Sequence, residues 1–270
     1  MQVERKPFFP VKDIVKSVED RVAHIMNQKE TIDYLCFVPD GEPTLDINLG
    51  AHIAALKPLG IPVAVISNGS LIAQESVQDD LLKADWVSLK VDALSESLWR
   101  EINRPQRSLK LDQILIGMQV FRKKFKGILA TETMLIKDIN DSEEACRDIS
   151  RFLADLQPDI AYLSIPTRPP AERSIRAAEP AALNMAFQKL VNNIKKVEIL
   201  SGYEGNAFSS TGDVQQDILN ITAVHPMRKD AVKDMLERGN TDWHVIKELL
   251  SSGQMAETEY NGHVFYLRSF

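Results

Sequence analysis

The feature that most constrains the fold of this 270-residue chain is an alternation of helical-period segments with short apolar runs between residues 10 and 200. This alternation is typical of βα units, in which helices join parallel strands and cover the sheet. We therefore expect an α/β domain of five or six strands. The predicted strands are Asp33–Val38, Val63–Ile66, Trp86–Val91, Ile128–Ile136 and Ile160–Ile165, with a further apolar run at Val197–Leu200. The predicted helices include residues 11–22, 47–57, 111–125 and 142–156.

The first recognisable element is a helix that Pro10 can open, and no strand pattern comes before it. A parallel sheet built from these segments would leave an unpaired edge where an earlier strand is expected. We therefore expect a sheet that lacks its first strand.

The pattern changes after Gly212, where three short helical segments precede two alternating strands. An Asn-Gly pair between such strands is a strong hairpin signal, and here it is Asn261-Gly262. The helices are predicted at 213–222, 229–237 and 242–250, and the strands at 256–260 and 264–268. We expect a domain at 1–212 and a small winged-helix-like module at 213–270, in which Asp242 caps the last helix.

The charge of the chain argues against nucleic acid as a partner. The formal net charge is −6, and residues 213–270 hold six Lys or Arg against nine Asp or Glu. Phosphate binding needs an excess of cations along one face. No apolar run reaches the roughly 20 residues of a membrane helix, so we expect a cytoplasmic protein without membrane contact.

The chain has two cysteines, Cys36 and Cys146, 110 positions apart. This spacing is typical neither of a disulfide framework nor of a clustered metal site. Cys36 lies within an apolar run, so we expect a buried, inert thiol there.

Polar residues follow the predicted strands at positions where the carboxyl ends of parallel strands meet. In such sheets ligands gather at these ends. Each residue alone fits a turn, a cap or a solvated edge, but together they predict one shared cleft. They are Gly41, Glu42, Pro43, Thr44, Ser67, Asn68, Lys90, Asp92, Glu132, Ile165, Pro166 and Arg168.

The chemistry of these side chains suggests ligand contacts. The Glu42 carboxylate could accept hydrogen bonds from an ammonium group, and Gly41 allows the backbone to approach a ligand closely. Lys90 lies in an apolar strand and needs a partner, for which Asp92 or Glu132 is suitable. Two interpretations remain open for these three residues: an ion pair between strands, or a catalytic role.

Several of these segments, in order, resemble the radical S-adenosylmethionine (SAM) superfamily. Gly41-Glu42-Pro43-Thr44-Leu45 resembles its glycine–glutamate–proline motif, and the segments 66–71, 87–93, 102–105 and 131–134 resemble the Fe–S oxidoreductase branch that is similar to the tRNA wyosine-base synthases. The similarity covers residues 5–212. It implies a partial (β/α)₆ TIM-like barrel, SAM as a small-molecule cofactor and an external electron donor.

The resemblance also implies roles for individual residues. Glu42, with Gly41, Pro43 and Thr44, would hold the methionine amine of the cofactor. Ser67 and Asn68 would meet its ribose or carboxylate, and Ile165 and Pro166 its adenine. The substrate side would hold Lys90, Asp92, Glu132 and Arg168.

One departure from the family pattern concerns the metal cofactor. Members carry a Cys-x₃-Cys-x₂-Cys loop whose thiolates bind a [4Fe–4S] cluster, and this chain has no such loop. We expect a fragment of a longer enzyme whose substrate is unidentified and which, as given, lacks cluster-dependent activity. The alternative is a non-catalytic SAM-like or partner-binding protein with a winged-helix interaction module.

Overall fold

The computed structural model describes residues 2–29, 31–38, 41–170, 172, 174–202, 205–206, 208, 210–224 and 226–269. The chain forms two compact units: the first is Met1–Ile165 with Ala177–Leu200, and the second is Pro166–Arg176 with Ser201–Phe270. The domain boundary predicted at residue 212 stays a prediction, because a division into compact units does not test where one domain ends and the next begins.

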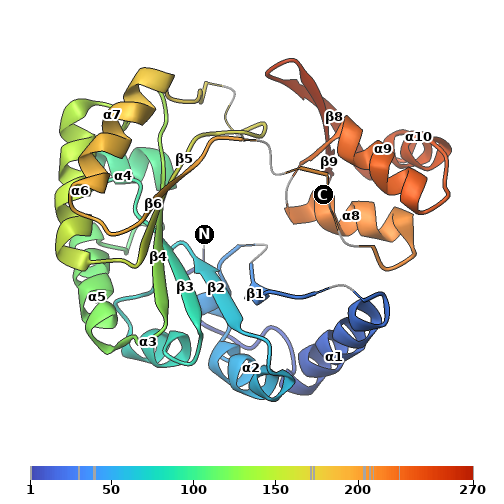
Figure 1. The fold of residues 1–270 in the computed structure, drawn as a ribbon, viewed down its shortest axis with the longest axis horizontal. Coiled ribbons are helices and arrows are strands. Elements are labelled where there is room, and N and C mark those ends of the chain that lie inside the picture. Colours follow the sequence, from blue (N-terminus) through green and yellow to red (C-terminus); the bar gives the residue numbers. More distant parts are fainter. Residues whose placement is uncertain are drawn as a thin grey trace. The chain divides into compact units, whose positions relative to one another are not determined.

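The first unit is built on a six-stranded parallel sheet whose strands lie side by side in chain order (Figure 1). The strands are β1 (Leu35–Phe37), β2 (Val63–Ser67), β3 (Trp86–Lys90), β4 (Ile128–Met134), β5 (Ile160–Ser164) and β6 (Val197–Leu200). Helical connections join them, as the alternation in the sequence predicts. This confirms an α/β fold of the partial TIM-like kind, with β1 and β6 at the two edges of the sheet.

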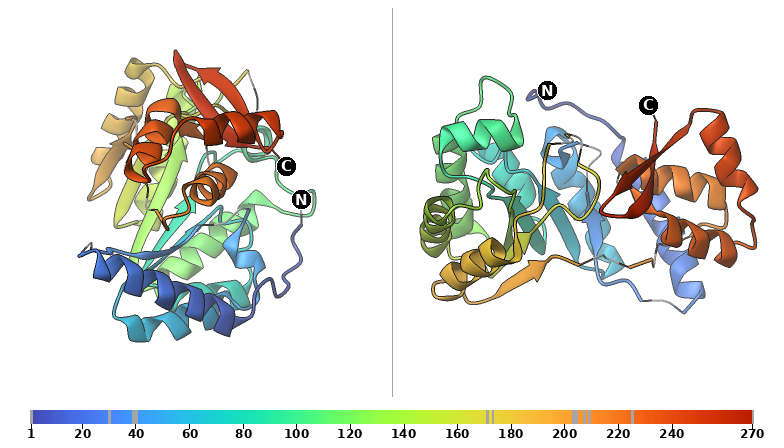
Figure 2. Two further views of the ribbon diagram at one scale, coloured as in Figure 1. Left: turned by 90° about the vertical axis from the view of Figure 1, so that its right-hand side faces the viewer. Right: turned by 90° about the horizontal axis from the view of Figure 1, so that it is seen from above.

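The helices of the first unit lie along the outer side of the curved sheet (Figures 1 and 2). The α-helices are α1 (Val11–Asn27), α2 (Leu49–Leu56), α3 (Glu75–Leu81), α4 (Glu96–Asn103), α5 (Leu111–Lys124), α6 (Glu143–Leu156) and α7 (Pro180–Val191), and the 3₁₀ turns are η1 (Pro43–Leu45) and η2 (Lys57–Leu59). No described helix has both the length and the apolar character needed to cross a bilayer.

The core of the first unit fills the space between the helices and one face of the sheet. Val65, Leu89, Leu129 and Leu163 are fully buried there. Because side chains alternate along a strand, residues such as Lys90 fall on the opposite face. That face is free to carry polar groups.

The prediction that Cys36 is buried was wrong, because its side chain is exposed. β1 is a three-residue edge strand in which Leu35 and Phe37 pack against the core, so the residue between them points the other way. An apolar run does not reveal which side of a strand is covered.

The second unit contains α8 (Val214–Val224), β7 (Met227–Arg228), α9 (Lys229–Arg238), α10 (His244–Ser251), β8 (Met255–Tyr260) and β9 (His263–Arg268). Its antiparallel strands have the order β7-β9-β8. Asn261 and Gly262 both have positive φ angles, as a tight hairpin turn requires. The Asp242 carboxylate accepts the N–H of His244, the first residue of α10, at 2.7 Å, although the N-cap position itself is held by Trp243. The winged-helix assignment itself remains a prediction.

Candidate active site

Glu42 carries a buried carboxylate between β1 and η1, at the carboxyl end of the sheet. Its side chain accepts four hydrogen bonds from the residues around it. Oε1 accepts from the backbone N–H of Thr44 (3.1 Å), the Thr44 hydroxyl (2.6 Å) and the Ser67 hydroxyl (2.7 Å). Among the described residues, the N–H of Asn68 is the donor to Oε2, at 2.8 Å, so this oxygen keeps capacity for another donor.

The loop after β2 folds around this carboxylate. The Ser67 hydroxyl also accepts the N–H of Gly69 at 3.0 Å, and the Asn68 side chain accepts the N–H of Ser70 at 2.8 Å. Thr44 and Ser67 are almost fully buried, whereas Asn68 is exposed. The two buried hydroxyls therefore hold Glu42 in place, and the exposed Asn68 uses its side-chain oxygen within its own loop.

A second charged cluster lies on β3 and β4. Lys90 and Glu132 are register partners on these strands, and the Lys90 Nζ lies 3.5 Å from Glu132 Oε1 and 3.7 Å from Asp92 Oδ1. The Ser164 hydroxyl donates to the same Glu132 oxygen at 3.0 Å. The structure thus brings together the three residues for which the sequence predicts an ion pair or a catalytic role.

The environment of Lys90 keeps its side chain charged. Burial favours the neutral amine, but the negative charges of Asp92 and Glu132 and their hydrogen bonds outweigh it, so the pKa of Lys90 lies above its ordinary value. Lys90 therefore acts as a cation and not as a free base near neutral pH.

The Asp92 carboxylate is held by hydrogen bonds from the end of α4 and the end of β4. Its Oδ1 accepts the N–H of Met134 at 2.9 Å, and its Oδ2 accepts the side-chain N–H of Asn103 at 2.8 Å. Asn140, which is fully buried, donates to the backbone carbonyls of Asp92 and Met134, each at 2.8 Å. These contacts hold the carboxylate rigidly at the end of β3.

A cavity of about 360 Å³ connects the two clusters within the first unit. Glu42, Asn68, Lys90 and Asp92 line it on the polar side. The apolar side is formed by residues of the α4–α5 region: Trp99, Leu109, Leu111, Ile114, Leu115 and Met118. Two carboxylates and one ammonium group thus border one space, whereas Glu132 is not among the described residues that line it.

Other predicted site residues lie elsewhere in the fold. Ile165 follows β5 at the end of the first segment of the first unit and packs against its core. Pro166 and Arg168 belong to the second unit, where the carbonyl of Pro166 accepts the Tyr260 hydroxyl at 3.2 Å. Their places near adenine and substrate stay predictions.

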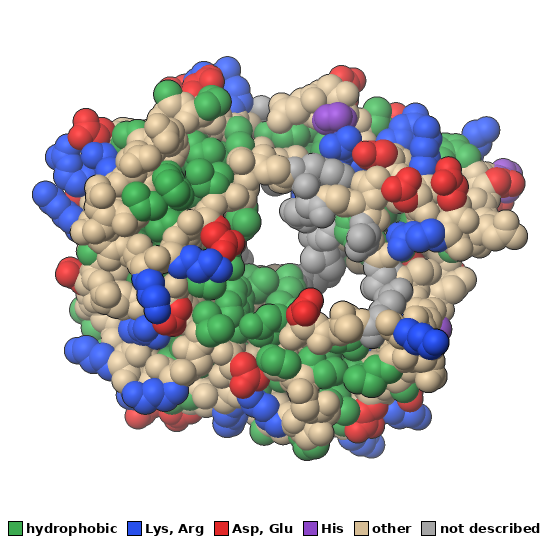
Figure 3. Space-filling view, viewed as in Figure 1, with side chains coloured by type: hydrophobic (Ala, Val, Ile, Leu, Met, Phe, Trp, Pro, Cys, Tyr) green, Lys and Arg blue, Asp and Glu red, His purple; other side chains and the backbone are tan. Residues whose placement is uncertain are grey.

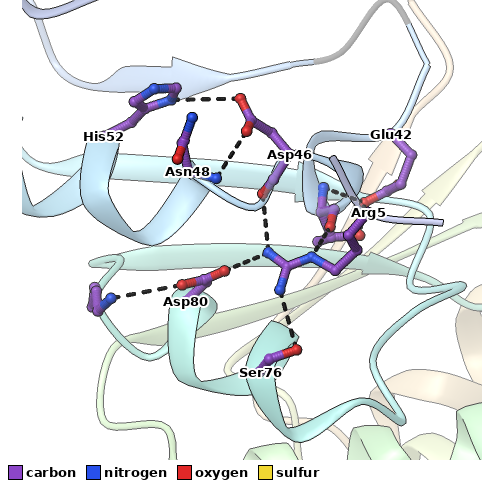
Figure 4. Close-up of polar contacts among 9 residues, drawn as sticks. Arg5, Glu42, Asp46, Asn48, His52, Ser76 and Asp80 are labelled. Atoms are coloured by element: carbon purple, nitrogen blue, oxygen red, sulfur yellow. Dashed lines mark hydrogen bonds and ion pairs between the residues drawn. The ribbon is translucent and has the colours of Figure 1, made fainter. Parts of the chain in front are cut away.

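Arg5 is a residue of the site that sequence reasoning did not identify (Figure 4). Its guanidinium reaches the carbonyls of Thr44 and Asp46 and the side chains of Ser76 and Asp80. These partners lie 39 to 75 positions away, so no local pattern could reveal them.

The two cysteines do not come together in a way that would suit an iron–sulfur cluster. Cys36 is exposed on β1 and Cys146 is buried in α6, and desolvation raises the pKa of both thiols to about 11. A [4Fe–4S] cluster of this family needs three thiolates, one more than the chain contains. Within the described ranges, no group of three or more His, Cys, Asp or Glu side chains is arranged to hold a metal ion.

Residues 5–149 match the family model described as the radical SAM superfamily. The chain belongs to this superfamily. A UPF0026 protein of Methanocaldococcus jannaschii is 43% identical to this radical SAM chain over 270 residues, which cover 99% of the chain and 83% of that protein. The resemblance predicted from the glycine–glutamate–proline motif is therefore confirmed.

Solved structures support the fold of this radical SAM chain. A radical SAM methyltransferase from Sphaerobacter thermophilus matches with a TM-score of 0.57 and 15% identity, over 73% of this chain and 59% of that chain. TYW1 with a lysine–pyruvate adduct bound matches with a TM-score of 0.50 and 19% identity, over 68% and 59% of the two chains. At such identities the likeness concerns the fold alone.

Proposed function

We propose that the first unit is the SAM-binding core of a radical SAM enzyme, and that Glu42 receives the methionyl ammonium group of the cofactor. The observation that carries this proposal is the Glu42 carboxylate, which borders the cavity and whose Oε2 atom accepts from one donor among the described residues. A charge-assisted hydrogen bond to an ammonium group would use that remaining acceptor capacity.

The neighbouring residues have separate roles in this proposal. Ser67 acts through Glu42, because its hydroxyl already donates to Oε1 and accepts from Gly69. Asn68 offers its amide N–H₂ to the ribose or carboxylate of the cofactor. Lys90 offers its ammonium group to an anionic group of cofactor or substrate, with Asp92 and Glu132 keeping it charged.

The [4Fe–4S] cluster of the superfamily supplies the electron that cleaves the sulfonium of SAM. The two cysteines of this chain do not fit that cluster, so we derive no electron-transfer step from the residues described here.

Titration with SAM carrying a ¹³C-labelled methyl group, followed by NMR, tests the proposed role of Glu42. We expect saturable shifts of the methyl signal with the wild-type protein and at least about tenfold weaker binding to Glu42→Gln, since a charged hydrogen bond is lost. Glu179→Gln is the matched control, because Glu179 is exposed and pairs with Lys137 instead of lining the cavity. Equal binding by Glu42→Gln and wild type would refute the proposal.

We further propose that the second unit is a winged-helix-like module with a packing or protein-contact role. The order α8-β7-α9-α10-β8-β9, with β9 paired between β7 and β8, supports this assignment. On the face seen in Figure 3, acidic and basic side chains alternate over the described surface without a continuous basic area. Fluorescence anisotropy with duplex DNA at low salt tests the role, and tight binding that weakens with salt would contradict it.

A further inference from the structure

We propose that Arg5 is a positioning residue for the cofactor-binding loop, which we define as residues 42–46. Arg5 fixes this loop so that the Glu42 carboxylate keeps its place at the cavity. The inference rests on the proposed function of Glu42, but its structural part can be measured separately.

Arg5 holds the cofactor-binding loop by its backbone carbonyls. Its Nε donates to the carbonyl of Thr44 at 2.8 Å, and its Nη2 donates to the carbonyl of Asp46 at 2.9 Å. The neighbouring backbone runs beside the same loop, because the N–H of Lys6 donates to Leu45 at 3.0 Å and the carbonyl of Lys6 accepts from Ile47 at 3.2 Å. Lys6 is thus paired with the end of the loop at Asp46.

Thr44 connects Arg5 directly to Glu42. Its carbonyl accepts from Arg5, while its N–H and hydroxyl donate to the Glu42 carboxylate. The loop itself contains only the 3₁₀ turn η1, and a three-residue turn of this kind has little stability alone. The position of Glu42 therefore depends on what holds Thr44.

The other side of the Arg5 guanidinium is anchored to α3, the helix that follows β2 (Figure 4). Nη2 contacts Asp80 Oδ2 at 2.5 Å, and Nη1 donates to Ser76 at 3.1 Å. Arg5 therefore ties the loop after β1 to the helix after β2. A lysine could keep the ion pair with Asp80, but it lacks the planar fork that reaches both carbonyls.

Three variants separate positioning from general stability. Arg5→Lys keeps a cation beside Asp80 and loses the fork on the loop. Asp80→Asn removes the ion pair but leaves the guanidinium on Thr44 and Asp46. Arg122→Lys is the matched control, because Arg122 pairs with Asp159, whose carboxylate accepts the N–H of Leu129 at the amino end of β4.

Amide hydrogen exchange, measured without SAM, reports the position of Glu42, because the N–H groups of Thr44 and Asn68 donate to its carboxylate. We expect Arg5→Lys to speed exchange at these two amides by about tenfold and to weaken binding of ¹³C-methyl SAM by a similar factor. Asp80→Asn should lower the melting temperature and change both other quantities by no more than about twofold. Arg122→Lys should affect exchange at Leu129 and not at Asn68.

Two results would overturn the role of Arg5. One is wild-type exchange at Thr44 and Asn68 in Arg5→Lys. The other is a loss of SAM affinity that is in the same proportion to the loss of stability in Arg5→Lys as in Asp80→Asn. If the wild-type protein binds no SAM, the proposed function of Glu42 fails instead, whereas exchange at the two amides still decides whether Arg5 positions it.

Discussion

The backbone N–H of Asn68 donates to the carboxylate of Glu42 at 2.8 Å, although the two residues are 26 positions apart. This bond joins the loop after β1 to the loop after β2 at one buried charge. Ser67, at the end of β2, adds its hydroxyl to the same carboxylate. Two adjacent strand ends therefore share one anionic centre, and substitutions there should affect both loops.

Replacing Glu42 by glutamine should destabilise the first unit. The amide has one acceptor oxygen for the four donors that the carboxylate now accepts, and its N–H₂ group would face N–H or O–H donors. We expect a loss of about 1–3 kcal/mol in the free energy of unfolding, measured by urea denaturation. Glu179→Gln should change it by less than about 0.5 kcal/mol, since that side chain is exposed. A Glu42→Gln protein as stable as wild type would contradict this expectation.

Replacing Lys90 by methionine should reduce stability and change its pH dependence. The variant leaves Asp92 and Glu132 without their shared cation, for an expected loss of about 1–3 kcal/mol near neutral pH. Because the pKa of Lys90 in the folded protein is raised above its ordinary 10.5, its stabilisation is complete below pH 10.5. It is lost as the pH rises through the folded-state pKa.

The measurement for Lys90 is the free energy of unfolding on both sides of pH 10.5. The gap between wild type and Lys90→Met should shrink on the alkaline side. A gap that stays constant or widens there would show that the ammonium charge is not what stabilises the strand pair.

Gly50→Ala should destabilise the protein, although alanine is the better helix former. Gly50 lies in α2, and a Cβ atom there would come within 2.0 Å of Asp80 Oδ1 and 2.5 Å of Lys83 Nζ. Asp80 cannot move away freely, because it is bound to Arg5. We expect a lower melting temperature instead of the usual gain of about 0.5–1 kcal/mol from Gly to Ala. A gain in stability would mean that Asp80 shifts without cost.

The two thiols should differ in accessibility. Cys36 is exposed on β1 and Cys146 is buried in α6, while desolvation raises the pKa of both thiols to about 11. Titration of the native protein with a chromogenic disulfide should therefore release one equivalent before unfolding, slowly at neutral pH and faster as the pH rises, and a second only after unfolding. Cys36→Ser should remove the first equivalent. Reaction of Cys146 in the folded Cys36→Ser variant would contradict the packing of α6.

Much of the fold could be predicted from the sequence, because the spacing of apolar residues within short segments indicates helices and strands. The alternation of helical and β-branched segments predicts five or six parallel strands, of which the structure has six, and Asn261-Gly262 predicts the terminal hairpin. Glu42, Lys90 and Asp92 could be selected as site residues because carboxyl ends of parallel strands meet at one edge. The motif at Gly41–Leu45 gave the family.

Only the tertiary structure decided which of these groups contact one another. Arg5 contacts Asp80, 75 positions away, and it also donates to the carbonyl of Thr44, whose N–H donates to Glu42. Such partners depend on the order of the strands and the placement of the helices, and the spacing of residues along a short segment does not reveal either. The exposure of Cys36 was likewise decided by the short edge strand that leaves one of its faces uncovered. Sequence periodicity records which side chains tend to be buried, whereas hydrogen-bond partners are set when distant elements pack together.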